Sequence, residues 1–125
     1  MIFGIGADIV EIDRIRGSLE RFGERFARRV LTASELAEFR ASSAPERLLA
    51  KRFAAKEAVV KALGLGFRQG LALNLIGVSH DDLGKPIIVY EGQALTCVKH
   101  LGIGASLITI SDEHRYAVAF AVVLC

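Results

Sequence analysis

Residues 2–12 alternate between two faces, and this period of two predicts a β-strand. One face carries Ile5, Ala7 and Ile9, and the other carries Gly4, Gly6, Asp8 and Val10. A carboxylate therefore shares a strand face with two glycines, and glycine within a strand often marks the close approach of a ligand or of another backbone. The other interpretation is tight packing of the strand on a helix, with Asp8 facing water at a sheet edge.

The next segment has a helical period. Apolar side chains recur at spacings of four, three and four, which predicts a helix over residues 12–30. These side chains are Ile15, Leu19, Phe22 and Phe26. Gly17 and Gly23 weaken this helix and leave open whether it is broken.

Two further helices are marked by their first residues. The residues Thr-Ala-Ser-Glu at 32–35 form a capping box, which begins a helix that ends near Arg40. Pro45 suits the first turn of the next helix, which is rich in strong helix formers and ends at Gly64.

The second half of the chain is predicted to be mainly extended. After a glycine-rich loop we expect an extended segment over 71–79, a strand over 87–90, a short helix over 91–101 and strands over 105–111 and 116–124. A polar turn at 112–115 joins the last two strands in an antiparallel hairpin. We therefore expect a single α+β domain over residues 1–125, with a mostly antiparallel sheet packed against helices.

The composition narrows the class of protein. The chain has 125 residues, 52% of them hydrophobic, and can bury a core. Its uncharged runs are shorter than the roughly 20 residues that span a bilayer, so we expect no membrane segment. Cys97 and Cys125 show neither CxxC nor zinc-ligand spacing, and reduced thiols would indicate a cytoplasmic protein.

The net charge of +2 is unevenly distributed along the chain. Between Arg14 and Arg52 there are ten Lys or Arg against five Asp or Glu, whereas the residues before Arg14 include three acids and no base. This asymmetry indicates a basic face that meets an acidic partner. An ordinary solvated helix surface explains the same charges equally well.

The candidate chemistry lies on the long helix and the first strand. Glu57 and Lys61 are four residues apart and share a helix face, where a surface ion pair worth a few tenths of a kcal/mol is one interpretation. The other interpretation joins them to Asp8. Two carboxylates, one from a strand and one from a helix, can hold Mg²⁺ while waters and substrate phosphate oxygens complete the octahedron. Lys61 would then neutralise phosphate charge or deliver a proton.

The chain contains two signature segments, GIGADIVEIDRI at 4–15 and RFAAKEAVVKALG at 52–64. They resemble those of the holo-acyl-carrier-protein synthases, which are small bacterial 4′-phosphopantetheinyl transferases. FARRVLT at 26–32, GKP at 84–86 and the closing ITISDEHRYAVAFAVV also follow the family order. The resemblance covers nearly the whole chain and implies the 4′-phosphopantetheinyl transferase fold. It also implies transfer of the 4′-phosphopantetheine arm of coenzyme A to a serine of apo-acyl carrier protein in fatty acid biosynthesis, with release of adenosine 3′,5′-bisphosphate.

The resemblance assigns roles by position. Asp8 and Glu57 match the residues that bind Mg²⁺, and Lys61 matches a lysine near the pyrophosphate that is a candidate acid for the leaving phosphate. The implied coenzyme A contacts are Arg52, Lys56 and Gly64, with Arg47 as a candidate partner of the 3′-phosphate.

The resemblance also implies two kinds of protein partner. One is acyl carrier protein, which is acidic, and the expected docking residues are Arg14, Arg25 and Phe26, with Arg21, Arg28 and Arg29 as further candidates. For at least two of these five arginines, plain solvent exposure is the expectation. The other partner is the chain itself, in a homotrimer in which Asp8 and Glu57 come from one subunit and part of the cleft wall from the next.

Two positions depart from the family pattern. Leu65 stands where many members have a threonine, so it offers no hydroxyl group. Asp112 stands where many members have the histidine of an ISH motif, and the role of that histidine transfers neither to Asp112 nor to His114.

Two other functions remain open from the residues alone. A non-catalytic basic module that binds acidic proteins or nucleic acid would explain the surplus of Lys and Arg, but not the two carboxylates, which repel phosphate unless a metal lies between them. The chain also lacks a run of aromatic side chains for base stacking, so we do not expect nucleic acid as a partner. A different Mg²⁺-dependent nucleotide enzyme would use the same cluster.

Overall fold

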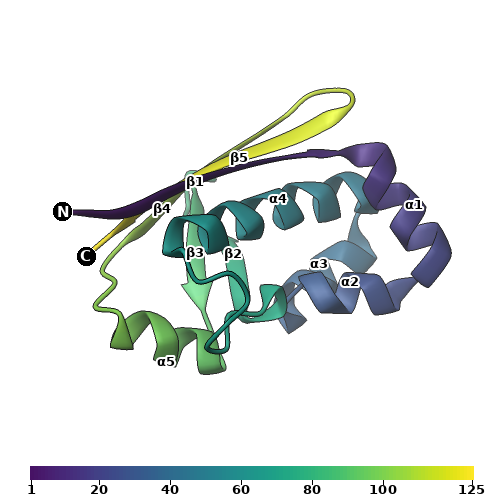
Figure 1. Cartoon of the computed structure of the whole chain (residues 1–125). Helices are drawn as coiled ribbons and strands as arrows, with labels where there is room; N and C mark the ends of the chain where they lie inside the picture. The colour runs from purple at the N-terminus through teal and green to yellow at the C-terminus, as the bar shows by residue number, and fades with distance from the viewer.

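The computed structural model describes residues 1–125 and shows helices packed below a three-stranded sheet (Figure 1). The strands are β1 (Ile2–Glu11), β2 (Ile76–His80), β3 (Pro86–Tyr90), β4 (Ser106–Asp112) and β5 (Tyr116–Leu124). The helices are α1 (Ile12–Phe22), α2 (Glu24–Val30), α3 (Ala33–Ala41), α4 (Pro45–Leu63) and α5 (Gly92–His100), with a 3₁₀ turn, η1, at Leu73–Leu75. The predicted α+β class is confirmed.

All strand pairs are antiparallel. The larger sheet has the order β1-β5-β4, and β2 and β3 form a separate hairpin. The long helix α4 packs along one face of the larger sheet and also contacts β2, so it lies at the centre of the molecule (Figure 1). None of the helices is both long and apolar enough to cross a membrane.

Gly4 and Gly6 allow α4 to lie directly against β1. A Cβ atom at Gly4 would collide with the backbone oxygen of Ala62, and a Cβ atom at Gly6 would collide with that of Ala58. Of the two interpretations of the glycine pattern, the structure therefore shows close packing of the strand on a helix. Asp8 lies on the same face of β1 as the glycines and is partly buried.

Small side chains continue this close approach where α4 meets β5. Both elements bury alanines that are at most 4% exposed, namely Ala54, Ala55, Ala58 and Ala62 of α4, and Ala117, Ala119 and Ala121 of β5. We call this set the alanine seam. Because a methyl group occupies little space, the helix and the sheet can approach more closely than they could with larger core side chains.

The predicted helix signals are largely confirmed. The backbone N–H of Thr32 donates to Glu35 Oε1 at 2.9 Å, and the N–H of Glu35 donates to Thr32 Oγ1 at 3.3 Å, which completes the capping box. The first predicted helix is broken at Gly23, whose φ of +64° favours glycine, whereas Gly17 lies inside α1.

The prediction of one extended segment over 71–79 is wrong in its first half. Leu73–Leu75 form η1, and pairing with β3 begins only at Ile76. The reason is packing: Leu71 and Ile76 are buried, and the turn between them places both side chains in the core.

Candidate active site

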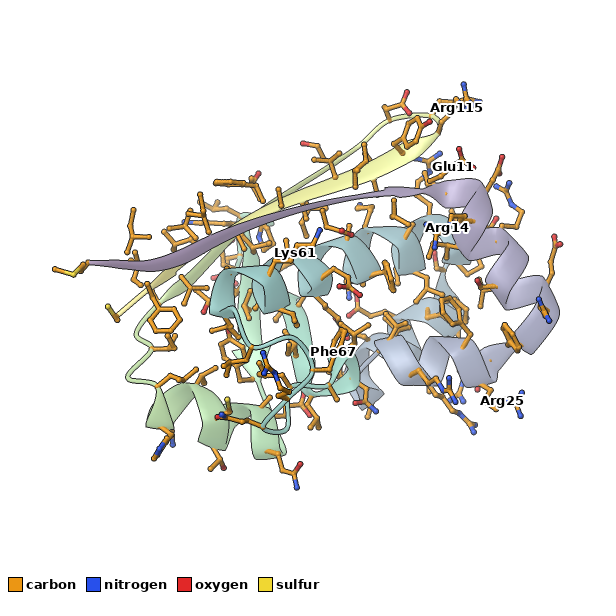
Figure 2. The ribbon with its side chains drawn as sticks, viewed as in Figure 1. Glu11, Arg14, Arg25, Lys61, Phe67 and Arg115 are labelled. Carbon is orange, nitrogen blue, oxygen red and sulfur yellow. The ribbon has the colours of Figure 1, made fainter.

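The predicted carboxylate on β1 and the predicted lysine on α4 meet where the two elements pack together. Lys61 Nζ donates hydrogen bonds to Asp8 Oδ1 and to the backbone oxygen of Ala7, both at 3.0 Å. Figure 2 shows Lys61 on α4 beneath β1. The side chain of Lys61 is 54% exposed and that of Asp8 is 16% exposed, so the site opens to solvent on the side of the lysine.

Glu57 lies one helical turn before Lys61 and is partly buried. Burial raises the pKa of its carboxyl group, and the negative charge of Asp8 raises it further, while Lys61 lowers it in part. The two carboxylates therefore repel each other across the site. A cation bound between them would remove that repulsion.

The residues present fit one kind of metal site. Asp8 and Glu57 supply two carboxylates, and Mg²⁺ is commonly held through one or two carboxylates together with substrate phosphates. The structure contains no group of three or more His, Cys, Asp or Glu side chains that could enclose a metal ion. The pair thus fits Mg²⁺ that binds together with a phosphate substrate, and it does not fit a closed zinc or calcium site.

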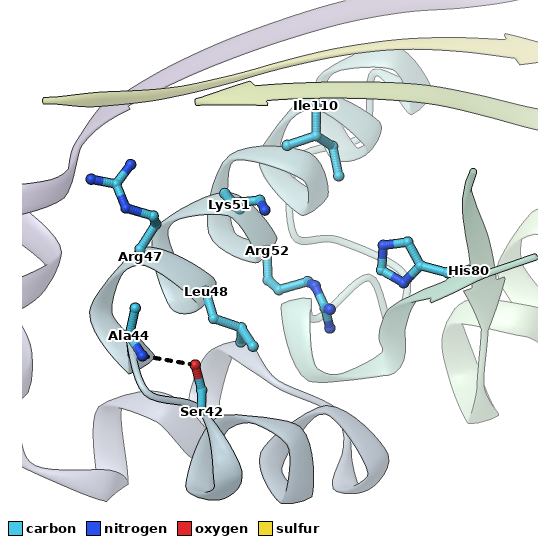
Figure 3. Close-up of a pocket in the computed structure, with 8 residues that line it drawn as sticks. All are labelled: Ser42, Ala44, Arg47, Leu48, Lys51, Arg52, His80 and Ile110. Carbon is cyan, nitrogen blue, oxygen red and sulfur yellow. Dashed lines mark hydrogen bonds between the residues drawn. The ribbon is translucent and has the colours of Figure 1, made fainter. Parts of the chain in front are cut away.

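A pocket of about 270 Å³ lies beside the N-terminal half of α4 (Figure 3). Its lining residues are Ser42, Ala44, Arg47, Leu48, Lys51, Arg52, His80 and Ile110. Three of these are cations of α4, and His80 lines the pocket from the end of β2 (Figure 3). The charge of this wall suits an anionic ligand.

Arg47 is fixed at the rim of the pocket by the β4–β5 turn. Its Nη1 donates to Asp112 Oδ2 at 2.9 Å and to the backbone oxygen of Glu113 at 2.7 Å. Its Nη2 donates to the backbone oxygen of His114 at 3.2 Å. Lys51 Nζ lies 3.8 Å from Asp112 Oδ1. Asp112, one of the two residues that depart from the family pattern, therefore faces two cations, Arg47 and Lys51.

Arg52 and Lys56 extend into the interior and meet Glu35. Lys56 is completely buried, and its ammonium group donates to Glu35 Oε1 and to the backbone oxygen of Val30. Arg52 donates to Glu35 Oε2 at 3.3 Å and to Glu38 Oε2 at 3.1 Å. The structure brings Lys56 neither to Asp8 and Glu57 nor to the pocket. A direct contact with a ligand would require this lysine to leave Glu35.

Glu35 is a buried residue for which the sequence predicted only the contact with Thr32. Its carboxylate also accepts a hydrogen bond from the backbone N–H of Val78 at 2.9 Å and pairs with Lys56 and Arg52. Burial raises the pKa of Glu35, but the charge and hydrogen bond of Lys56 outweigh it and hold the pKa below its ordinary value. The sequence did contain one signal for a buried acidic partner: Arg52 and Lys56 are four residues apart in an otherwise apolar stretch of helix.

Gly64 ends α4 as predicted. Its φ of +79° is left-handed, and a Cβ atom there would meet nothing within 4 Å. The backbone conformation therefore favours glycine, and the exposed main chain at this position is open to a ligand.

The arginines predicted to dock a partner lie on α1 and α2. Arg14 and Arg25 are exposed (Figure 2), and so are Arg21, Arg28 and Arg29. A hollow of about 280 Å³ on this surface is lined by Ser18, Phe22, Arg25, Phe26 and Arg29. The helical period indicated a buried face for Phe22, yet this residue is 46% exposed and lines the hollow. Aromatic and basic side chains are thus combined on one surface.

The face of the larger sheet opposite α4 is apolar and exposed. Ile5 and Ile9, which share a face in the predicted alternation, are 60% and 63% exposed. Across the sheet Ile9 is paired with Val118, and the neighbouring Phe120 and Leu107 are also exposed. A patch of this kind marks an interaction surface.

Comparison with known proteins shows which protein family this chain matches. The 4′-phosphopantetheinyl transferase superfamily matches residues 4–121. The holo-[acyl-carrier-protein] synthase of Vibrio cholerae is 51% identical over 119 residues, which cover 95% of this chain and 94% of the relative. That of Nitrosospira multiformis is 50% identical over 98% of each chain.

Solved structures agree with the sequence comparison. The crystal structure of the holo-[acyl-carrier-protein] synthase from Neisseria meningitidis has a TM-score of 0.96 and 43% identity over the whole of both chains. The Helicobacter pylori synthase in complex with coenzyme A has a TM-score of 0.82 and 31% identity, covering 95% of this chain and 98% of that one. The family match over residues 4–121 and these identities show that the chain belongs to the 4′-phosphopantetheinyl transferase superfamily.

Proposed function

We propose that this chain is a holo-acyl-carrier-protein synthase, which transfers the 4′-phosphopantetheine arm of coenzyme A to a serine of apo-acyl carrier protein and releases adenosine 3′,5′-bisphosphate. The observation that carries the proposal is the convergence of Asp8, Glu57 and Lys61, in a chain whose relatives bear this name. Residues 1–125 act as one transferase domain in this proposal.

Asp8 and Glu57 hold Mg²⁺ in the proposed mechanism. The ion would supply positive charge against the pyrophosphate as negative charge develops on the leaving group. The raised pKa of Glu57, caused by burial and by Asp8, supports the assignment, because a bound cation stabilises the ionised form of both carboxylates.

Lys61 is the proposed acid for the leaving phosphate. Its ammonium group is exposed on one side and held by Asp8 and the backbone of Ala7 on the other. An ammonium group that is 54% exposed can meet a phosphate oxygen from the solvent side and donate a proton or a hydrogen bond to it. Asp8 therefore orients Lys61 before the substrate binds.

The basic pocket beside α4 is the proposed site for the nucleotide part of coenzyme A. Arg47 and Lys51 bring their charges to its rim, Arg52 contributes to its wall, and Gly64 offers exposed backbone at the other end of the helix. Lys56 acts indirectly, since its ion pair with Glu35 fixes α4 from within.

The surface of α1 and α2 is the proposed docking site for the acidic acyl carrier protein. Arg14 and Arg25 supply positive charge, and the hollow beside Phe26 receives an apolar side chain of the carrier. Arg29 lines the same hollow as Arg25, whereas Arg21 and Arg28 lie outside it and increase the rate of encounter in this proposal.

A homotrimer is the proposed assembly. The exposed apolar face with Ile5, Ile9 and Phe120 supports contact between copies, because water would otherwise meet large side chains on the whole face. In this assembly Asp8 and Glu57 come from one subunit and part of the cleft wall comes from the next, for which the basic pocket is the candidate. Co-expression of Glu57→Gln chains with Arg47→Gln chains tests the shared cleft: mixed assemblies recover transfer activity that neither variant shows alone.

The decisive experiment measures the mass of a carrier protein. The protein is incubated with coenzyme A, Mg²⁺ and apo-acyl carrier protein, and the carrier gains the mass of one phosphopantetheine group. Asp8→Asn abolishes most of this gain, whereas Asp82→Asn, the same change in the exposed β2–β3 turn, does not. Carrier protein that binds tightly but gains no mass, across several carriers, would instead support the non-catalytic basic module.

A further inference from the structure

Asp112 places a negative charge at a pocket whose wall is otherwise cationic. Arg52, one of the three cations of the wall, is already neutralised by Glu35 and Glu38. Arg47 and Lys51 are therefore the cations that can meet an incoming anion, and both face Asp112.

The carboxylate contacts these cations as a phosphate would. Its Oδ2 accepts the hydrogen bond of Arg47 Nη1, and its Oδ1 lies 3.8 Å from Lys51 Nζ, so one oxygen serves each cation. The guanidinium group is also held by the backbone oxygens of Glu113 and His114. Arg47 therefore stays in place without Asp112, and the main effect of the carboxylate is on charge.

We propose that Asp112 is a specificity-determining residue that competes, as an internal anion, with nucleotide phosphates for Arg47 and Lys51. The inference rests on the proposed function, because it takes the basic pocket as the nucleotide site. Asp112 lowers the affinity of the pocket for coenzyme A and for adenosine 3′,5′-bisphosphate alike. Since the bisphosphate is the product of the proposed reaction, weaker binding favours its release.

The size of the effect follows from the charges. Asp112→Asn raises the charge of the group formed by Arg47, Lys51 and residue 112 from +1 to +2. The side chain of Asp112 is 28% exposed, so the charge is partly screened by water. We expect adenosine 3′,5′-bisphosphate to bind about tenfold more tightly to Asp112→Asn, which corresponds to about 1.4 kcal/mol.

Isothermal titration calorimetry of the protein with adenosine 3′,5′-bisphosphate, coenzyme A and adenosine measures this effect. Asp112→Asn and Asp112→Ser bind both phosphate ligands more tightly, with a steeper dependence on salt, while the affinity for adenosine is unchanged. Asp82→Asn controls for the change in net charge and behaves as the wild type. In an Arg47→Gln/Lys51→Gln background, Asp112→Asn changes the affinity by less than about threefold, because both cations that it would release are absent.

The outcomes separate this inference from the proposed function. If the wild type binds coenzyme A and modifies the carrier, but Asp112→Asn and Asp112→Ser bind the bisphosphate no more tightly, the inference alone is refuted. Weaker binding by both variants also refutes it and makes Asp112 a residue that orders the pocket. If the wild type binds no adenosine nucleotide, the assignment of the pocket and the inference fail together. Thermal melting of each variant identifies any that does not fold.

Discussion

The completely buried Lys56 allows a sharp test of what holds α4 in place. In Lys56→Met a flexible apolar side chain of similar length replaces the ammonium group. The variant removes both hydrogen bonds of Lys56, to Glu35 and to the backbone oxygen of Val30. The carboxylate of Glu35, which is 1% exposed, then keeps Arg52 and two backbone N–H groups as donors.

The cost can be worked out from the contacts that remain. Removing one partner of a buried ion pair typically costs 3–5 kcal/mol, because the other charge stays buried without compensation. Glu35 keeps three donors here, so we expect the lower end, about 3 kcal/mol. With an unfolding entropy of about 2.1 cal/mol/K per residue, a chain of 125 residues should melt about 10 °C lower.

Differential scanning calorimetry and urea unfolding measure the change. Lys99→Met, the same substitution at an exposed position of α5, is the matched control and should shift the melting temperature by no more than about 2 °C. Glu35→Gln/Lys56→Met should be more stable than Lys56→Met alone, because the buried carboxylate that has lost Lys56 is then neutral. A decrease of less than about 3 °C for Lys56→Met would contradict the buried ion pair.

The same variant separates an internal role of Lys56 from a contact with coenzyme A. At a temperature at which Lys56→Met is fully folded, the KM for coenzyme A should stay within about twofold of the wild-type value if the lysine acts only through Glu35. A rise of tenfold or more, with kcat unchanged, would show that Lys56 contributes to substrate binding in the working enzyme.

Three further predictions concern pH, packing and assembly. The pKa of Glu35 is lowered in the folded state by Lys56, so its contribution to stability is present above the unfolded value of 4.5 and is lost as the pH falls below it. Urea unfolding at pH 7 and at about pH 4 should show this loss in the wild type and a smaller loss in Glu35→Gln. Gly6→Ala should destabilise the chain by about 1–3 kcal/mol, because the new Cβ atom meets the backbone oxygen of Ala58. Gly17→Ala is the control on α1, where a Cβ atom meets nothing within 4 Å, and it should stabilise the chain by about 0.5–1 kcal/mol. The opposite order of stabilities would contradict the packing of α4 on β1. Phe120→Lys should lower the mass found by analytical ultracentrifugation to that of a single chain. Leu83→Lys, at a turn residue that is 95% exposed, should leave the mass of the wild type unchanged. The same mass for Phe120→Lys and the wild type would count against assembly through the sheet face.

The strand and helix patterns predicted that Asp8 and Lys61 face each other, and the physical reason is local. The strand period placed Asp8 on the face of Gly4 and Gly6, and that face meets α4 in the structure. The helix period placed Glu57 and Lys61 on one face, and the structure brings Lys61 to Asp8. Local periodicity is enough here, because both groups lie on regular elements that pack along their length.

Residues whose partners are distant in sequence could not be predicted in this way. Lys56 lies next to Glu57, yet it points away from the acidic pair to Glu35, which lies 21 residues earlier. Asp112 meets Arg47, from which it is 65 residues distant. Such ion pairs depend on how separate elements pack, and the spacing of residues within one element does not contain that information.

The alanine seam has a consequence for how this chain tolerates substitution. Glu57 and Lys61 flank Ala58, and Asp8 lies opposite Ala119 on the neighbouring strand. The distance between α4 and the sheet that carries Asp8 is thus set in part by two layers of methyl groups. Larger side chains in the seam would push α4 away from the sheet and so widen the gap between Asp8 and Lys61. Saturation mutagenesis should therefore find that these alanines tolerate serine or glycine and reject valine, so that side-chain volume in the seam limits the activity of a site whose own residues are unchanged.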